Sequence, residues 1–427
     1  MSKKRIAAIV LALSMTLSLC GCAFETSVEE LFTLPQVPVE YGGLMKELEN
    51  LIDDGYEYAS PASGKSTQSV QMVDLNGDGL EEAVAFFRRS SDEKPLKIFV
   101  FQGIEDDYQL LCTMASSGSS IDSVHFEDLT GDGKMEIVVG WKISSDVQTL
   151  AVYSVGREFI SLVSTPYIRF AVQDIDGSGG ANLLVLRTDT VPVCECYEWH
   201  GDALQVTSRA VLSSTAAEIS RGTVIAGQLE GMQPALFVTG VSEELSAVTD
   251  ILVYQHTAGL SNLATDSLSG KTAVVYPYQQ LPPQDINGDG VTEIPSPVVD
   301  NVLHQNMVSW FAYGAAGHCH QVAETYHSQT QGWYFTMPQS WWGHASAVEQ
   351  ELTEGDYAVT ISVNGEEAVA LYKFSGDDRE EQATAEGLTL ISRQTAANYA
   401  GKLLRARTGI TPDELRHSFY LPDSVWG

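Results

Sequence analysis

One acidic loop pattern occurs four times in this 427-residue chain, beginning at Asp74, Asp128, Asp174 and Asp285. In each copy an oxygen-bearing side chain stands at positions one, three, five and nine, and glycine follows position five. Calcium is a hard cation that takes six to eight oxygen ligands, and glycine permits the left-handed backbone of a sharp turn. The pattern therefore predicts four short calcium-binding loops.

The predicted ligands are the side chains at positions one, three, five and nine and the backbone carbonyl at position seven. In chain order, the ligand residues are Asp74, Asn76, Asp78, Leu80 and Glu82; Asp128, Thr130, Asp132, Lys134 and Glu136; Asp174, Asp176, Ser178, Gly180 and Asn182; and Asp285, Asn287, Asp289, Val291 and Glu293. The third loop has Ser178 and Asn182 where the other loops have carboxylates, so three to four calcium ions are expected.

An EF-hand is excluded by the residues that follow each loop. That motif places a bidentate Glu at position twelve and a helix on either side of the loop. The residues at position twelve are Ala85, Val139, Val185 and Ser296. The flanking segments are short and rich in β-branched and aromatic residues, as Ser69–Val73 and Ala83–Phe87 illustrate. Such segments are typical of strands, so each loop is expected to join two strands.

The spacing of the loops predicts the architecture. The first three loops follow one another at about 50 residues, and the fourth comes after about twice that interval. Residues 224–238 lie midway and keep a strand, glycine turn and strand without the acidic ligands, which indicates a fifth, metal-free repeat. Four strands are expected in the first unit and four in the second: Ser69–Val73, Glu82–Phe87, Leu96–Phe101 and Tyr108–Met114; Ser123–Phe126, Glu136–Trp141, Gln148–Tyr153 and Phe159–Val163.

A period near 50 residues with four strands per unit is typical of a β-propeller blade. The predicted fold class is therefore mainly β, with a propeller of about five four-stranded blades (range five to seven) and a small C-terminal α+β domain. These repeats resemble the FG-GAP and VCBS-type repeats of calcium-binding β-propellers, roughly over residues 66–325. The resemblance implies calcium in the loop between the first two strands of a blade, and it implies no reaction.

The N-terminus predicts export and a lipid anchor. Three basic residues precede the apolar run Ile6–Leu19, which is too short to span a bilayer. The sequence Leu19-Cys20-Gly21-Cys22 resembles the lipobox of bacterial lipoproteins, with Cys22 as the lipidated residue and Cys20 as the poorer fit. An ordinary secretory signal with a chance cysteine is the alternative. The expected location is extracytoplasmic, at the cell membrane.

Four domains are predicted along the chain. Residues 1–21 form the signal peptide and residues 22–66 a tether with a short helix at Leu44–Ile52. Residues 67–327 form the propeller. Residues 328–427 form the α+β domain, with strands at Tyr357–Val363, Ala368–Phe374 and Leu388–Ser392, a turn at Asn364-Gly365, and a helix that begins after Thr411.

Charge and cysteine content narrow the range of partners. The formal net charge of −32 argues against nucleic acid, because binding to phosphates needs Lys and Arg. It also argues against adhesion to anionic lipid through a basic surface, which leaves the lipid anchor as the membrane contact. Outside the signal region the cysteines are too few for a disulfide scaffold, so buried thiols are expected and a disulfide among them stays open: Cys112, Cys194, Cys196 and Cys319.

No motif of catalysis stands out. The chain has no G-x-S-x-G, H-E-x-x-H, Walker or Rossmann pattern. His318 and His320, with His327 nearby, suggest a transition-metal pair, but no third ligand lies at a convincing spacing, so scattered polar histidines are the preferred interpretation. Trp341 and Trp342 are expected at the core and rim of the small domain.

The predicted function is a non-catalytic binding or scaffold protein at the cell surface, whose ligand is an unidentified protein or glycan. Two alternatives remain open. One is a polysaccharide-acting lyase or hydrolase with its site in the propeller channel, which would require clustered Tyr, Arg and His from several blades. The other is a purely structural envelope protein, which a flat acidic face would favour.

Overall fold

The computed structural model describes residues 41–421, except 105–106, 146, 157–158, 267–268, 299–305, 329–330, 354 and 406–408. The predicted signal peptide, Cys22 and the first part of the tether lie outside the described residues. Among the residues that the structure describes, none of the helices is long and apolar enough to cross a membrane.

Six antiparallel sheets of four or five strands follow one another in the described part of the chain, and we number them one to six. Sheet one contains β1 (Glu57–Tyr58), β2 (Val70–Val73), β3 (Glu82–Arg88), β4 (Leu96–Ile104) and β5 (Asp107–Ser116). Sheet two contains β6 (Ser120–Glu127), β7 (Glu136–Lys142), β8 (Gln148–Val155) and β9 (Phe159–Pro166). Sheet three contains β10 (Arg169–Gln173), β11 (Asn182–Thr188), β12 (Pro192–His200) and β13 (Ala203–Val211).

The remaining sheets are less regular. Sheet four contains β14 (Thr223–Leu229), β15 (Gln233–Val241), β16 (Ser246–Gln255), β17 (Gly259–Asn262) and β18 (Val275–Pro277). Sheet five contains β19 (Ile294–Pro297), β20 (Met307–Tyr313), β21 (Cys319–Ser328), β22 (Trp333–Thr336) and β28 (Phe419–Tyr420). Sheet six contains β23 (Ala345–Thr353), β24 (Asp356–Val363), β25 (Glu366–Phe374), β26 (Thr389–Arg393) and β27 (Asn398–Leu403).

Short helices accompany the sheets: α2 (Gly42–Asp53), α3 (Ala216–Arg221), α4 (Arg379–Ala383), α5 (Pro412–His417) and the 3-10 turn η4 (Gln339–Trp341). The α5 helix begins where its sequence predicts, because Thr411 caps the backbone N–H of Glu414 and the Glu414 side chain caps that of Thr411. The predicted hairpin turn at Asn364-Gly365 is also present, with φ of 53° and 77°.

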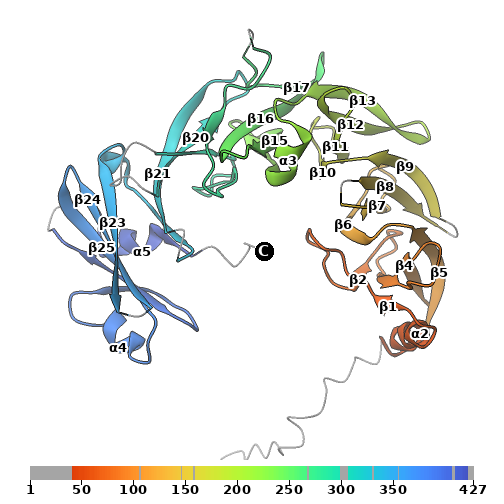
Figure 1. Cartoon of the computed structure of the whole chain (residues 1–427), viewed down its shortest axis with the longest axis horizontal. Helices are drawn as coiled ribbons and strands as arrows, with labels where there is room; N and C mark the ends of the chain where they lie inside the picture. Colours follow the sequence, from red (N-terminus) through yellow and green to blue (C-terminus); the bar gives the residue numbers. More distant parts are fainter. Residues whose placement is uncertain are drawn as a thin grey trace, which may run out of the picture.

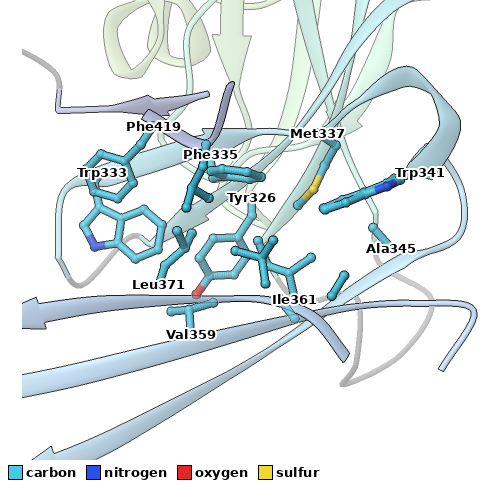
Figure 2. Close-up of a cluster of buried hydrophobic side chains, with 14 of the residues drawn as sticks. Tyr326, Trp333, Phe335, Met337, Trp341, Ala345, Val359, Ile361, Leu371 and Phe419 are labelled. Atoms are coloured by element: carbon cyan, nitrogen blue, oxygen red, sulfur yellow. The ribbon is translucent and has the colours of Figure 1, made fainter. Parts of the chain in front are cut away.

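Neighbouring sheets pack face to face along the chain, which gives a propeller-like succession. Phe86 and Trp141 belong to one apolar cluster between sheets one and two, and comparable clusters join each later pair. Between sheets five and six, Tyr326 and Phe335 face Val359 and Leu371 (Figure 2). The central strands are buried on both faces, so they are continuous apolar runs rather than alternating ones.

The succession of sheets forms an open arc, with sheet one at one end and sheet six at the other (Figure 1). A propeller that closes into a ring packs its first blade on its last. Here the end face of sheet one packs on α2, whose Leu44 and Leu48 join the cluster that contains Phe87 and Phe101. The end face of sheet six packs on α4 through Ala383. A helix therefore covers each end of the arc.

The chain returns to sheet five after it has completed sheet six. β22 pairs with β21, and β28 pairs with β22 through Tyr334–Tyr420 and Phe335–Phe419. The domain boundary predicted between residues 327 and 328 therefore runs through sheet five, and sheet six is inserted between two strands of that sheet. Trp341 is buried in the shared core, and Trp342 is partly buried and donates its indole N–H to the Met337 carbonyl.

Candidate metal centres in the acidic loops

Each acidic loop is folded around the carboxylate at position one. In the first loop, Asp74 Oδ1 accepts the backbone N–H of Gly77 at 2.8 Å and Asp74 Oδ2 accepts that of Gly79 at 2.9 Å. Both glycines have positive φ, 75° and 87°, which residues with a Cβ rarely adopt. The second and fourth loops repeat this arrangement around Asp128 and Asp285.

The side chains at positions three and five form successive turns along the loop. Asn76 Oδ1 accepts the N–H of Asp78 at 2.9 Å, and Asp78 Oδ1 accepts the N–H of Leu80 at 2.8 Å. Short polar side chains stabilise turns in this way by bonding the backbone two residues ahead. The predicted ligand residues of a loop therefore lie on one compact turn. The third loop forms the same turn with Asp176 and Ser178.

Position nine is the first residue of the strand that follows three of the loops, and its side chain reaches back to position two. Glu82, Glu136 and Glu293 are at most 1% exposed, and one carboxylate oxygen of each accepts the position-two N–H at 2.9–3.0 Å. In the third loop Asn182 Oδ1 takes the same role with Ile175 at 2.9 Å. Position nine is thereby tied to position two in all four copies, and in the first three this joins the loop to the following strand.

The fourth loop differs in its first strand. The other three loops lie between two strands of one sheet, β2–β3, β6–β7 and β10–β11. The fourth loop is preceded by a single β-bridge between Gln284 and Glu293 and is followed by β19. The β14–β15 hairpin occupies the place of the predicted fifth repeat, and its turn, Glu230-Gly231-Met232, lacks the acidic pattern.

Burial and neighbouring negative charges determine the ionisation of Glu82, Glu136 and Glu293 in the described structure. Burial raises the pKa of Glu82 and of Glu136, and the aspartates at positions one and five add to the effect. Burial raises the pKa of Glu293 to about 7, again with a contribution from the charges of Asp289 and Asp285. A cation beside these carboxylates would favour their ionised forms.

Within the described residues, three buried oxygens at ligand positions form no hydrogen bond of good geometry: Thr130 Oγ1, Asp174 Oδ1 and Glu293 Oε1. Such orphaned atoms are costly unless another group pairs with them. In the described residues no group of three or more His, Cys, Asp or Glu side chains is arranged to hold a metal ion, and the loop carboxylates accept backbone N–H groups instead. The donor types, carboxylate, amide and hydroxyl oxygen, fit a hard divalent cation.

Adjacent units contact one another through these loops. The N–H of Met135 in the second loop donates to the Leu75 carbonyl in the first at 2.9 Å. Between sheets four and five, the N–H of Thr292 in the fourth loop donates to the carbonyl of Gln228 in β14 at 2.8 Å. The loops are therefore part of the contact between neighbouring sheets. The sequence motif identifies each loop but contains no signal for these bonds, because they depend on how the sheets stack.

Gly77 and Gly131 provide a matched pair of variants for the contact between the first two loops. Both occupy position four and have φ of 75°. A Cβ on Gly77 would lie 2.5 Å from the Gly133 carbonyl oxygen, whereas a Cβ on Gly131 would meet nothing within 4 Å. We expect Gly131→Ala to destabilise the chain by about 1–2 kcal/mol through backbone strain alone. Gly77→Ala should cost about 1–3 kcal/mol more, because the second loop must move.

Urea unfolding of the two variants measures this difference. The strain term is common to both, so it cancels, and the remainder reports the inter-loop contact. Equal midpoints for Gly77→Ala and Gly131→Ala would show that the two loops are independent of each other.

The four cysteines in the described part of the chain, Cys112, Cys194, Cys196 and Cys319, are free thiols in this structure. Cys112, Cys194 and Cys196 are buried as predicted, whereas Cys319 is exposed, contrary to the prediction. Burial raises the pKa of Cys112 to about 11 and that of Cys196 to about 12, so both thiols stay protonated and unreactive at neutral pH. The thiols of sheet three therefore act as small apolar side chains in the core.

No protein-family model and no curated protein matches the sequence. Among solved structures, the chain is similar to one described as the crystal structure of BBS1N in complex with ARL6DN, soaked with lead. The identity is 12% and the TM-score is 0.32, over 82% of this chain and 96% of that chain. The chain is also similar to a functionally unknown protein from Desulfotomaculum acetoxidans, at 11% identity and a TM-score of 0.34, over 70% and 83% of the two chains. Similarity at this level carries no argument about function, and membership of the FG-GAP and VCBS families stays a prediction.

Proposed function

We propose that the chain is an exported, lipid-anchored, calcium-stabilised protein with propeller-like sheets, which acts as a non-catalytic binding or scaffold protein at the cell surface. The observation that carries the proposal is the shared geometry of the four acidic loops, in which a buried position-nine side chain is tied to a turn of acidic residues. The resemblance to FG-GAP and VCBS repeats supports the same conclusion.

The oxygens at positions one, three, five and nine and the position-seven carbonyl would hold the cation in each loop. Calcium supplies positive charge that neutralises the clustered carboxylates. Glu82 and the other position-nine side chains hold each loop by accepting the position-two N–H. The backbone hydrogen bond from Met135 to Leu75 joins the second loop to the first. The rigid arc would then present its loops to a ligand.

Export would keep such loops filled. Extracellular calcium modules work at dissociation constants of about 0.1–1 mM, a concentration range found outside cells. Lipidation at Cys22, after removal of residues 1–21, would hold the protein at the membrane without a spanning helix. Mass spectrometry of the protein extracted from membranes tests for this lipid, and an unmodified Cys22 would contradict the anchor.

A glycan and peptide array, probed with the purified chain in millimolar calcium, separates the binding role from its two alternatives. Retention on specific glycans or peptides that stay intact is the expected result, and it should weaken when calcium is chelated. Shortened glycans would identify a polysaccharide-acting enzyme and contradict the proposal. Absence of any binding would favour the structural envelope role and would contradict it as well.

A further inference from the structure

Two histidines and a glutamate from different sheets meet at the junction between sheets four and five. Glu230 lies in the β14–β15 turn, and His318 and His320 lie on the hairpin that joins β20 to β21. His318 Nε2 is 3.8 Å from Glu230 Oε2, and His320 Nδ1 is 3.5 Å from Glu230 Oε1. Each imidazole therefore faces a different oxygen of one carboxylate.

The backbone holds this group in place. The N–H of Glu230 donates to the Tyr313 carbonyl at 3.0 Å, which fixes the turn of sheet four against β20. The N–H of Gly314 donates to the His318 carbonyl at 2.9 Å and closes the β20–β21 hairpin. These main-chain bonds hold the backbones of the two hairpins beside each other, which brings the three side chains within reach of one another.

Gly314 leaves the space that the group occupies. A Cβ built on this glycine would lie 2.7 Å from His318 Cε1 and 3.2 Å from Glu230 Oε2. Gly314 is not among the glycines with positive φ, so its backbone does not demand glycine. A side chain here would displace the His318 ring from its contact with the carboxylate.

We propose that Glu230, His318 and His320 form a binding site for one borderline transition-metal ion such as Zn²⁺. Two imidazole nitrogens and a carboxylate oxygen are a characteristic zinc donor set, and they differ from the all-oxygen set of the acidic loops. Three protein ligands leave one coordination position for water or for a donor from a partner.

Metal binding requires the three side chains to move toward a common point. In this structure the three side chains form ion-pair contacts, and they do not yet converge on one point. Ligand atoms on a tetrahedral zinc ion lie roughly 3.3 Å apart, given bonds of about 2.0–2.1 Å. The observed separations of 3.5 and 3.8 Å end on different oxygens of Glu230, so each imidazole must approach the carboxylate and also turn toward the other imidazole. The side chains of His318 and His320 are 70% and 56% exposed, so they are free to rotate.

The site stands at the repeat that lacks the acidic loop. The β14–β15 turn has none of the acidic pattern at its ligand positions, and Glu230 is its one carboxylate. A metal held here would join sheet four to sheet five through side chains of both. The inference does not depend on calcium binding by the other loops.

Zinc titration of the full chain in saturating calcium tests the site, with a chromophoric zinc chelator as competitor. We expect the wild type to bind one zinc ion that the His318→Ala/His320→Ala double variant binds at least about tenfold more weakly, because even a lost supporting hydrogen bond to a metal ligand costs that much. Gly314→Ala should also weaken binding although it removes no ligand, since its Cβ displaces the His318 ring.

The matched control is His256→Ala, which removes another exposed histidine on the turn after β16. It should leave zinc affinity unchanged. Thermal unfolding without zinc checks that each variant is folded, and the substituted side chains are exposed enough for this to be expected. Equal zinc affinity in the wild type and the double variant would overturn the proposal and leave the contacts as ion pairs only. An effect of His256→Ala equal to that of the double variant would overturn it too.

Discussion

Chelation of calcium is expected to lower the thermal unfolding midpoint of the chain, and millimolar calcium is expected to raise it. A ligand that binds only the folded state stabilises it by RT ln(1 + [L]/Kd). With Kd of about 0.1–1 mM, calcium at about 10 mM contributes about 1.4–2.7 kcal/mol per filled loop. Three or four loops together give a shift large enough to see by calorimetry or circular dichroism.

Substitution of one position-nine glutamate at a time should show how much each loop contributes to the stabilisation by calcium. Glu293→Gln removes a buried charge that lies near Asp289 and Asp285 and has one oxygen without a partner. Without calcium the variant should be at least as stable as the wild type, because a repulsive buried charge is gone. With calcium it should lack the increment of about 1.4–2.7 kcal/mol for one loop. Glu82→Gln and Glu136→Gln should behave alike.

Gln233→Ala is the control for these variants. Gln233 is the first residue of β15 and therefore holds the position-nine place in the repeat without the acidic pattern. Its response to calcium should equal that of the wild type. Two results would refute calcium binding by the loops: a midpoint that neither calcium nor a chelator moves, or a full calcium response in the Glu82, Glu136 and Glu293 variants.

Local patterns predict the strands well, because each strand carries its own signal. The predicted strand Glu136–Trp141 corresponds to β7, and the predicted helix Leu44–Ile52 lies within α2. The local sequence of a strand or helix does not indicate which sheet it pairs with or packs on. α2 is expected as part of a tether, whereas it covers the end face of sheet one. The two-residue strand β28 is too short for any periodicity, yet it makes sheet six an insertion in sheet five.

The candidate sites divide in the same way. The acidic loops are contiguous in sequence, so spacing alone brings their residues together, and the position-nine side chain does reach the turn. The pairing of Glu230 with His318 and His320 joins two hairpins of different sheets. The histidine pair is visible in the sequence, but its third member depends on sheet stacking, which no local spacing rule contains.

Replacement of the apolar face of α2 is expected to uncover the end of the arc. Leu44 and Leu48 are 5% and 3% exposed and lie one helical turn apart, packed in the cluster that contains Phe87, Phe99 and Phe101. Truncation of a buried leucine to alanine typically costs about 2–5 kcal/mol. The Leu44→Asp/Leu48→Asp variant should lose at least this at each position, because the helix must then bury charge or detach.

A detached α2 leaves an apolar sheet face in contact with water, and such faces drive association. We therefore expect the Leu44→Asp/Leu48→Asp variant to elute as oligomers in size-exclusion chromatography with light scattering, and to unfold at lower urea concentration. Met45→Asp is the control on the same helix, because Met45 is 37% exposed. That variant should keep the size and stability of the wild type. If the double variant did the same, α2 would not be the element that ends the arc, and sheet one would need another cover.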